Sequence, residues 1–553
     1  LHPFWLSKGF DGAMKLSEEG LRDREAWERI GVSLPSYDIS SVRRKSIAAP
    51  RWVHFGIGNI FRIFIGGIAD TLLNEGEFDR GISCAESFDF DLVDRIYRPH
   101  DNLLLSVTLN PDGSLEKRVI ASLAEAVKAE DGGWERLREI FRSRELQIAS
   151  LTITEKGYAL RGADGSFLPF VREDLERGPE KPLSVMAILT ALLYERFRSA
   201  AGPIALVSMD NCSKNGEKLR SSVLTVAEEW RKRGFLPEDF LHYLEEESEV
   251  SFPWTMIDKI TPRPAEAVAE KLSELGIEDM EILVTGKGTY IAPFVNAEGP
   301  QYLVIEDRFP NGRPPLEKAG VYMTDRDTVN RVERMKVTTC LNPLHTALAV
   351  YGCLLGYRRI SDEMKDRELR ALVERIGETE GLPVVTDPGI LSPRAFLSEL
   401  LSIRIPNPYM PDTPQRIATD SSQKVGIRYG ETIKAYVERF GSAERLLGIP
   451  LAIAGWLRYL LAVDDEGRSF ECSPDPMLKS LTEALSGIRL GEPDSVADRL
   501  RPILSNENIF GIDLYRAGIG EKIEGYFREE LRGRGAVRAT LKKYLSGEED
   551  KKS

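Results

Sequence analysis

Histidine and cysteine are scarce in this chain of 553 residues, and their scarcity limits the chemistry that it can carry. The five cysteines are odd in number, and no two of them form a Cys-x-x-Cys pair. This pattern indicates free thiols in a reducing compartment, so we expect a cytoplasmic protein. The histidines also number only five, which argues against a metal site built from His and Cys ligands. We therefore expect chemistry that uses an organic cofactor or side chains alone.

A surplus of basic residues and long apolar runs are missing as well. The chain has 74 Lys and Arg against 87 Asp and Glu, a net charge of −13, which argues against a nucleic-acid partner. No apolar run approaches the length of a membrane-spanning helix, so no membrane partner is expected. Residues 1–13 lack the pattern of a secretory signal, and Met14 is the expected natural start. No pattern in the sequence predicts the oligomeric state.

The length and the hydrophobic pattern predict two domains after an extension and lead-in helix at residues 1–50. Residues 51–325 alternate strand and helix patterns, which predicts an α/β, Rossmann-like domain with a doubly wound parallel sheet. Residues 326–553 show only helical patterns, which predict an all-helical substrate domain. Strands are expected at 103–108, 117–121, 148–154, 204–208, 281–285 and 302–305, and helices at 134–141, 183–199, 217–233 and 264–275. The acidic stretch 236–251 is expected to be an insertion in solvent.

A glycine turn begins the α/β part. The apolar run Trp52–Phe55 passes directly into Gly56-x-Gly58, and apolar residues at helical spacing follow. A strand, a glycine turn and a helix in this order hold a dinucleotide pyrophosphate through backbone N–H groups and the helix dipole. Phe61 replaces the third glycine, so the glycine exit of any α/β strand is an alternative. The predicted cofactor contacts are Gly56, Gly58, Asn59, Ile60, Phe61 and Arg62.

The next predicted strand, residues 81–86, ends on an acid, Glu86. A carboxylate at this position can accept hydrogen bonds from both ribose hydroxyls and repels a 2′-phosphate, which favours NAD over NADP as the cofactor. Asp89 could share or take this role. Alternatively, either acid could cap a helix.

An amine, an amide and an imidazole stand close together in the stretch from Lys336 to His345. Pro343 fits the first turn of an apolar helix that runs to about Leu355, with Asn342 as its N-cap. Lys336 is expected in an extended stretch or loop. A buried helix N-terminus that carries His345 can bind an oxygen that gains negative charge. The alternative is a surface lysine, a simple cap and a core histidine.

Further polar clusters occur where predicted strands end, at residues 152–158, 208–212 and 252–262, and in the helical part at 407–424. With these motifs in matching order from about Trp52 to Lys424, the chain resembles the polyol-specific long-chain dehydrogenases and reductases. That family includes mannitol 2-dehydrogenase, fructuronate reductase (mannonate oxidoreductase) and tagaturonate reductase. The overall likeness is greatest to the fructuronate reductases.

The resemblance implies a metal-independent enzyme that interconverts D-fructuronate and D-mannonate by hydride transfer with NAD(H). Lys336 matches the general acid/base of the family, and Asn211 and Asn342 match the amides that hold the reacting oxygen. His345 matches the residue that orients this oxygen, and Glu333 matches an acid on a proton path. The matching substrate contacts are Arg416, Lys424 and Asp258, and the cations available to a uronate carboxylate are Arg416, Lys424 and Lys156.

One departure from the family concerns the spacing of its catalytic residues. The family lysine precedes the asparagine by five residues, whereas Lys336 precedes Asn342 by six. A bulge in the Thr338-Thr339 segment would absorb the extra residue and leave Lys336 in place.

Other readings stay open for individual residues and for the whole protein. Asn211 could cap the helix that follows it, Glu333 could be a solvated charge, and Arg416 could pair with Asp420 on a helix surface. The open alternatives for the function are mannitol 2-dehydrogenase, tagaturonate reductase and a non-catalytic NAD- or sugar-binding protein.

Overall fold

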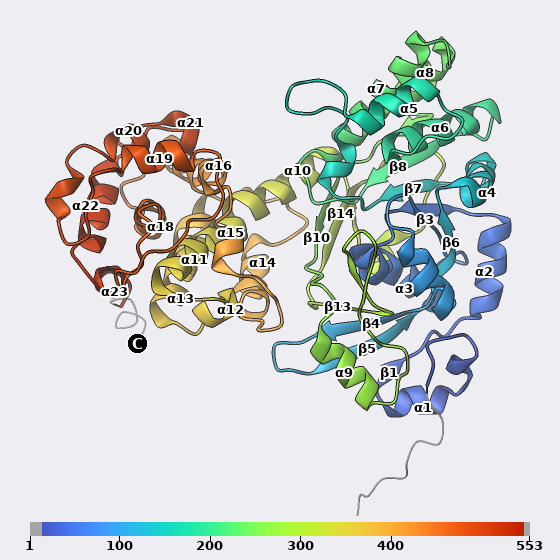
Figure 1. Ribbon diagram of the computed structural model, residues 1–553, viewed down its shortest axis with the longest axis horizontal. Helices are drawn as coiled ribbons and strands as arrows, with labels where there is room; N and C mark the ends of the chain where they lie inside the picture. The colour runs from blue at the N-terminus through green and yellow to red at the C-terminus, as the bar shows by residue number, and fades with distance from the viewer. Residues whose placement is uncertain (1–13, 547–553) are drawn as a thin grey trace, which may run out of the picture. The chain divides into compact units, whose positions relative to one another are not determined.

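The computed structural model describes residues 14–546 and separates into two compact units (Figure 1). The first unit extends to Asn330, and the second begins at Arg331. None of the helices in the described residues has the length and apolar character needed to cross a membrane.

The first unit is built on a six-stranded sheet in which every pair of neighbouring strands is parallel. The strand order is β6 (Leu123–Lys128), β3 (Ile82–Glu86), β2 (Trp52–Phe55), β7 (Ile148–Leu151), β8 (Ile204–Ser208) and β9 (Val250–Ser251). All residues of β2, β3, β7 and β8 are buried, as expected for a sheet covered on both faces. The predicted α/β class with a doubly wound parallel sheet is confirmed.

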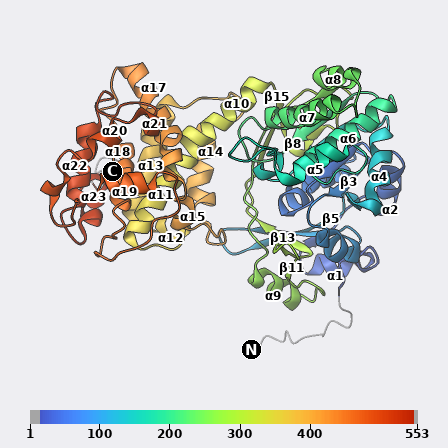
Figure 2. The same ribbon diagram turned by 45° about the horizontal axis from the view of Figure 1, so that its top comes forward.

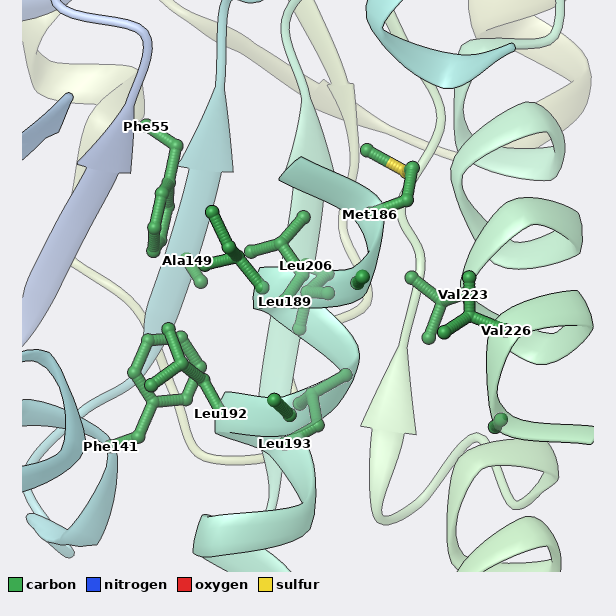
Figure 3. Packing of buried hydrophobic residues seen from close by; sticks show 14 of the residues in the cluster. Phe55, Phe141, Ala149, Met186, Leu189, Leu192, Leu193, Leu206, Val223 and Val226 are labelled. Atoms are coloured by element: carbon green, nitrogen blue, oxygen red, sulfur yellow. The ribbon is translucent and has the colours of Figure 1, made fainter. Parts of the chain in front are cut away.

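Alternate residues of each strand pack on opposite faces of this sheet. Phe55, Ala149 and Leu206 point to one face, where they meet the helices α4 (Asp131–Arg142), α6 (Val185–Arg198) and α7 (Asn215–Lys232), as Figure 3 shows. Trp52 and Ile148 point to the other face, where they join the core beneath α3 (Gly66–Asn74). Figure 2 shows α5 (Pro169–Arg177), α6 and α7 gathered on the first of these faces.

Four of the predicted strands, those at 103–108, 117–121, 281–285 and 302–305, belong to other sheets. β4 (Leu104–Leu109) and β5 (Leu115–Ile120) form an antiparallel hairpin in the sheet β1-β5-β4-β13, and β14 (Tyr302–Glu306) lies between β10 (Thr255–Asp258) and β15 (Tyr322–Thr324). β4 and β5 cannot be parallel neighbours because residues 110–114 are too short for a crossover. The remaining strands are β1 (Val32–Ser33), β11 (Leu283–Val284), β12 (Tyr290–Ile291) and β13 (Phe294–Ala297).

The prediction of a solvent insertion at residues 236–251 is wrong. This stretch forms α8 (Glu238–Glu245) and β9, and β9 extends the parallel sheet beside β8. Phe240 and Leu244 recur at helical spacing among the acidic residues and are fully buried. The prediction failed because it relied on the acidic composition and not on the helical spacing of these apolar residues.

In the described part of the chain, no named strand follows β15, and the second unit is helical, which confirms the class predicted for it. Its centre is the pair α11 (Asn342–Leu355) and α18 (Gly448–Tyr459), both almost wholly buried. Gly455 lets these two helices approach closely, because a Cβ there would lie 2.5 Å from Cζ of Tyr351. Around this pair lie α13 (Arg367–Glu374), α14 (Pro393–Glu399), α16 (Ser421–Val425), α17 (Glu431–Phe440), α22 (Gly520–Glu530) and α23 (Ala536–Leu545).

Candidate active site

The glycine turn after β2 has the geometry that its sequence predicts. Gly56 has a φ of +85°, and a Cβ there would lie 2.1 Å from the carbonyl oxygen of Thr152, so only glycine fits. A Cβ on Gly58, by contrast, would meet no described atom within 4 Å. The backbone at Gly58 therefore borders open space, which suits the close approach of a pyrophosphate.

The helix after this turn begins with free backbone donors. Its first intrahelical hydrogen bond runs from the N–H of Arg62 to the carbonyl oxygen of Gly58 (3.0 Å), so the N–H groups of residues 59–61 have no partner within the helix. Phe61, where the fingerprint has its third glycine, is fully buried and stacks on His54 with ring centroids 4.0 Å apart. An aromatic pair thus replaces the close helix–strand packing that a glycine allows. These features fit a dinucleotide cofactor.

Glu86 holds the glycine turn and the loop after β3 together. Its Oε1 accepts hydrogen bonds from the N–H groups of Ser87, Phe88 and Asp89 (3.0, 2.9 and 3.3 Å), and its Oε2 accepts one from Ile57 (3.2 Å). Burial raises the pKa of Glu86, and these four donors oppose the rise. Asp89 accepts a hydrogen bond from the Thr285 hydroxyl at Oδ2 (2.7 Å). Contact of either acid with a ribose stays a prediction.

Arg62 points into the first unit. Its Nη1 donates to the carbonyl oxygen of Ala292 (2.9 Å), and its guanidinium lies 5.7 Å from the ring centroid of Tyr97. Burial lowers the pKa of Arg62 to about 10, and its buried Nη2 has no hydrogen-bond partner among the described residues. This position favours a structural role, and contact between Arg62 and a cofactor stays a prediction.

The ends of β7 and β8 are joined through Asp210. Its Oδ1 accepts a hydrogen bond from the Thr154 N–H (2.9 Å), and its Oδ2 accepts one from the Tyr158 hydroxyl (2.6 Å). Thr154 has a φ of +67°, a strained backbone conformation for a β-branched residue. Backbone strain of this kind is found more often at functional sites than elsewhere.

Asn211 follows Asp210 and is exposed. The capping alternative for Asn211 is wrong, because α7 begins only at Asn215 and its cap position is held by Lys214 without a side-chain hydrogen bond. It is Asn215 whose amide binds the carbonyl oxygens of Ser208 and Asp210. Sequence reasoning missed this residue, although its place just after the strand-end motif was a signal.

Asp258 is the last residue of β10 and is buried opposite Tyr302 of β14. The ammonium of the next residue, Lys259, donates to the carbonyl oxygen of Glu298 (2.7 Å), which fixes the end of the strand. Asn211 and Asp258 thus both lie where strands of the first unit end.

In the second unit, Lys336 does not lie in the predicted extended stretch. It begins a π-helical turn, Lys336–Cys340, that joins α10 (Arg326–Met335) to α11. The Leu341 N–H donates to the Lys336 carbonyl oxygen (3.0 Å), a hydrogen bond from residue i+5 to residue i. The helix tolerates Thr338 partly because its hydroxyl bonds back to the carbonyl oxygen of Arg334 (2.7 Å). Helical continuity therefore outweighs the β-branched pattern on which the prediction relied.

This π-turn bears on the extra residue between Lys336 and Asn342. A π-helical turn contains one residue more than the α-helical hydrogen-bond pattern allows and commonly appears as a single turn inside an α-helix. Such a turn can take up one extra residue without ending the helix. That it does so here, and leaves Lys336 in the place of the family lysine, stays a prediction.

Asn342 is not the N-cap of α11. It is the first residue of the helix, Leu341 holds the cap position, and no side chain caps this end. The chain enters α11 directly from the preceding π-turn, so Asn342 lies inside a continuous helical stretch and not at its start.

His345 lies in the first turn of α11 and is half-buried. Its pKa is lowered to about 4, first by burial and then by the positive charges of Arg428, Arg404 and Arg416, while Asp412 opposes the shift. The imidazole is therefore neutral at neutral pH, and it can donate one hydrogen bond and accept another.

Lys336 is 4% exposed, so it is buried. The alternative prediction of a surface lysine is therefore wrong. Glu333 stands three residues earlier on α10 and is half-buried. Residues three apart on a helix share a face, so this carboxylate lies on the side of the helix that carries Lys336.

The predicted substrate contacts Arg416 and Lys424 follow on short helices. Arg416, on α15 (Pro414–Ile417), forms an ion pair with Asp412 and not with Asp420. The Lys424 ammonium donates to the Thr419 carbonyl oxygen, and the pKa of Lys424 is lowered by burial and by the nearby Arg428 and Arg416. Sequence reasoning missed Arg428, although its position four residues after Lys424 was a signal.

The second unit thus contains Glu333, Lys336, Asn342, His345, Arg416 and Lys424. Arg416 is close enough to act on His345 and on Lys424. Asn211 and Asp258 belong to the first unit, and their approach to Lys336 stays a prediction. Among residues 14–546, no group of three or more His, Cys, Asp and Glu side chains has the geometry to hold a metal ion.

Comparison with known proteins identifies the family. A model described as the mannitol dehydrogenase Rossmann domain matches residues 50–318, and one described as the mannitol dehydrogenase C-terminal domain matches residues 328–526. A D-mannonate oxidoreductase of Thermotoga maritima is 56% identical over 542 residues, which cover 97% of this chain and all of that protein.

Two solved structures share the fold. Substrate-free D-sorbitol dehydrogenase is 26% identical with a TM-score of 0.76, and the match covers 92% of this chain and 97% of that one. Mannitol 2-dehydrogenase of Pseudomonas fluorescens, in a ternary complex with NAD and D-mannitol, is 27% identical with a TM-score of 0.67, and the match covers 97% and 100%. The resemblance inferred from the sequence is confirmed, and the chain belongs to the mannitol dehydrogenase family of oxidoreductases.

Proposed function

We propose that this protein is an NAD-dependent oxidoreductase that interconverts D-fructuronate and D-mannonate in the cytoplasm. The observation that carries the proposal is the 56% identity to a D-mannonate oxidoreductase over nearly the whole of both chains. The buried amine and the neutral imidazole of the second unit supply groups that such a reaction needs.

The first unit, proposed as the NAD-binding domain at residues 51–325, holds the cofactor. Gly58 leaves room for the pyrophosphate, and the unpaired N–H groups of residues 59–61 donate to it. Bound NADH supplies the hydride for reduction of a ketone. Glu86 keeps the turn in shape, and Asp89, which has an oxygen outside its Thr285 bond, accepts from a ribose hydroxyl.

The second unit, proposed as the substrate domain at residues 326–553, handles the proton and the reacting oxygen. Lys336 donates a proton to the carbonyl oxygen of fructuronate as the carbon is reduced, and it takes the proton back when mannonate is oxidised. The amide of Asn342, together with that of Asn211, stabilises the negative charge that develops on this oxygen. Neutral His345 orients the reacting oxygen of the substrate. Glu333 passes the proton of Lys336 to and from water.

The sharpest test is a screen of NADH oxidation by the purified protein with fructuronate, tagaturonate and fructose as substrates. We expect turnover to be fastest with fructuronate. Faster turnover of tagaturonate or fructose would assign one of the other family activities. NADH binding without turnover of any of the three would favour a non-catalytic protein.

The proposal also includes independence of a metal. Treatment of the protein with a chelator, followed by its removal and the same assay, should leave the rate unchanged. A loss of rate that added divalent metal restores would overturn this part of the proposal.

A further inference from the structure

A short helical segment in the second unit is fixed against the stretch that carries Lys336 and His345. This segment is the π-turn η11 (Gly426–Gly430), which continues into α17. The Tyr429 hydroxyl donates to the carbonyl oxygen of Pro343 (2.8 Å), and the Thr432 hydroxyl donates to that of Thr338 (3.2 Å). The segment is therefore bonded on both sides of Asn342, and the side chains that it presents there have defined positions.

Arg428 is one of these side chains. Its Nη1 donates to the hydroxyl of Thr346, the residue after His345, at 2.6 Å. This is its one hydrogen bond within residues 14–546, and no Asp or Glu among them forms an ion pair with it. A guanidinium has five N–H donors, so most of the hydrogen-bonding capacity of Arg428 is unused.

The surroundings of Arg428 are strongly basic. Arg404, Arg416 and Arg428 all act on the imidazole of His345. Lys424 lies near Arg416 and Arg428, and the acids Asp420 and Asp475 also act on it. Asp412 is the acid that acts on His345, and it is already paired with Arg416. Burial lowers the pKa of Arg428 to about 10, and the opposing influence is only the phenol of Tyr429. The nitrogens of Arg428 that lack a partner are not among the fully buried atoms, so a ligand can reach them and supply the anion that the described residues do not.

A carboxylate suits this position better than a neutral hydroxyl group does. The planar guanidinium fork matches the two oxygens of a carboxylate, and such charge-assisted pairs are stronger than neutral hydrogen bonds. We propose that Arg428, held by Thr346 and assisted by Lys424, binds the carboxylate of a sugar acid and so selects uronates over neutral ketoses and polyols. This inference rests on the proposed function, whose substrate has a ketone near one end of its carbon chain and a carboxylate at the other.

Steady-state kinetics of Arg428→Gln with fructuronate and with fructose test this assignment. Glutamine keeps a donor near Thr346 but removes the charge. We expect the KM for fructuronate to rise about tenfold to a hundredfold, which is the loss of one charge-assisted interaction. The KM for fructose and the Kd for NADH should stay unchanged, and Arg428→Lys should restore part of the affinity for fructuronate. Equal rises in KM for both substrates would overturn the inference.

A binding measurement separates this inference from the proposed function. Thermal unfolding in the presence of D-mannonate or D-mannitol needs no turnover. Mannonate should raise the Tm of the parent protein and raise that of Arg428→Gln much less, whereas any shift with mannitol should be the same in both. If the parent binds mannonate through Arg428 but reduces no fructuronate, the proposed function fails and the carboxylate site stands. If it reduces fructuronate and the variant responds to mannonate as the parent does, the site fails and the function stands.

The matched control is Arg489→Ala, which removes an arginine that is 72% exposed and lies 3.9 Å from Glu492. It should change neither KM nor the response to mannonate. Thr346→Val removes the hydroxyl that orients Arg428 and keeps the charge. It should raise the KM for fructuronate by a smaller factor than Arg428→Gln does, and a KM equal to that of the parent would remove Thr346 from the assignment.

Discussion

The two units differ in how they satisfy buried charge. In the first unit, buried carboxylates accept hydrogen bonds from backbone N–H groups. Glu86 accepts four such hydrogen bonds, and Asp174 accepts hydrogen bonds from the N–H groups of Leu183 and Ser184. In the second, neither oxygen of the buried carboxylate of Glu363 has a hydrogen-bond partner in the described part. Glu380, which accepts three backbone N–H groups, shows that the second unit can also satisfy an acid in this way.

This difference matches a division of labour. A carboxylate that is hydrogen-bonded by backbone amides holds a loop in one conformation. A binding site for a cofactor, whose structure does not vary, needs loops that are held in this way. Groups with unused hydrogen-bonding capacity can serve a ligand or a proton instead. The predicted acid–base residue, Lys336, lies in the second unit, so the largest effects on the chemical step are expected there.

Replacement of Lys336 by alanine should have the largest effect on activity. Loss of a general acid costs about 10²–10⁴ in rate, and kcat for NADH oxidation should fall by that factor while the Kd for NADH stays unchanged. Lys365→Ala is the matched control, because Lys365 is 72% exposed and pairs with Asp362. If Lys336→Ala keeps kcat within a few-fold of the parent value, the assignment of the acid–base group to the second unit is wrong.

The glycine turn offers a paired test of the first unit. Gly56→Ala combines a positive φ with a clash against Thr152, and it should destabilise the protein by more than the roughly 1 kcal/mol of a strained backbone alone. Gly58→Ala meets open space in the protein, so its Tm should match that of the parent while its Kd for NADH rises about tenfold through contact with the cofactor. Unchanged NADH binding in Gly58→Ala would show that the cofactor does not approach this turn.

The sequence predicted the parts of this structure that depend on local pattern. The Gly56 turn follows from a steric requirement that only glycine meets, and the α/β and helical halves follow from hydrophobic periodicity. Interactions between distant residues were not predictable in the same way. The hairpin β4–β5 joined a different sheet, and Lys336 entered a helix despite its β-branched neighbours. Arg428 meets Thr346 across a long stretch of sequence, and no local pattern indicates such a contact.

Glu86→Gln tests whether the acids of the first unit act through their backbone donors. Both carboxylate oxygens accept N–H groups, and glutamine must place an NH₂ group against at least one of these donors. Loss of a buried hydrogen bond to a charged group costs about 1–3 kcal/mol, and urea unfolding should show a loss of this size together with weaker NADH binding. If the variant has the stability of the parent but binds NADPH better, Glu86 is a ribose contact and not a scaffold for the turn.

The smallest effect on activity is expected at Glu530, a buried acid of the second unit on α22. The hydroxyl of Tyr351 lies 2.7 Å from both the Leu451 carbonyl oxygen and Oε1 of Glu530. One hydroxyl proton cannot serve both acceptors, so Glu530 must carry a proton for both contacts to be hydrogen bonds. This agrees with a pKa that burial raises from 4.5 to about 8. A hydrogen bond from Tyr351 to the ionised carboxylate and the charge of Arg458 oppose the rise.

The raised pKa of Glu530 gives the stability of the second unit a pH dependence. In the unfolded chain the acid ionises near its ordinary pKa, so its contribution to stability is complete below that value and is lost as the pH rises toward about 8. Glu530→Gln copies the protonated form and should remove this slope, with a gain of several kcal/mol near the upper end of the window, since one pKa unit corresponds to about 1.4 kcal/mol. Thermal unfolding of the variant, the parent and the exposed-site control Glu521→Gln across this range measures the gain. Parallel curves for all three would mean that Glu530 is ionised in the folded protein and that its charge is satisfied as fully as those of the first unit.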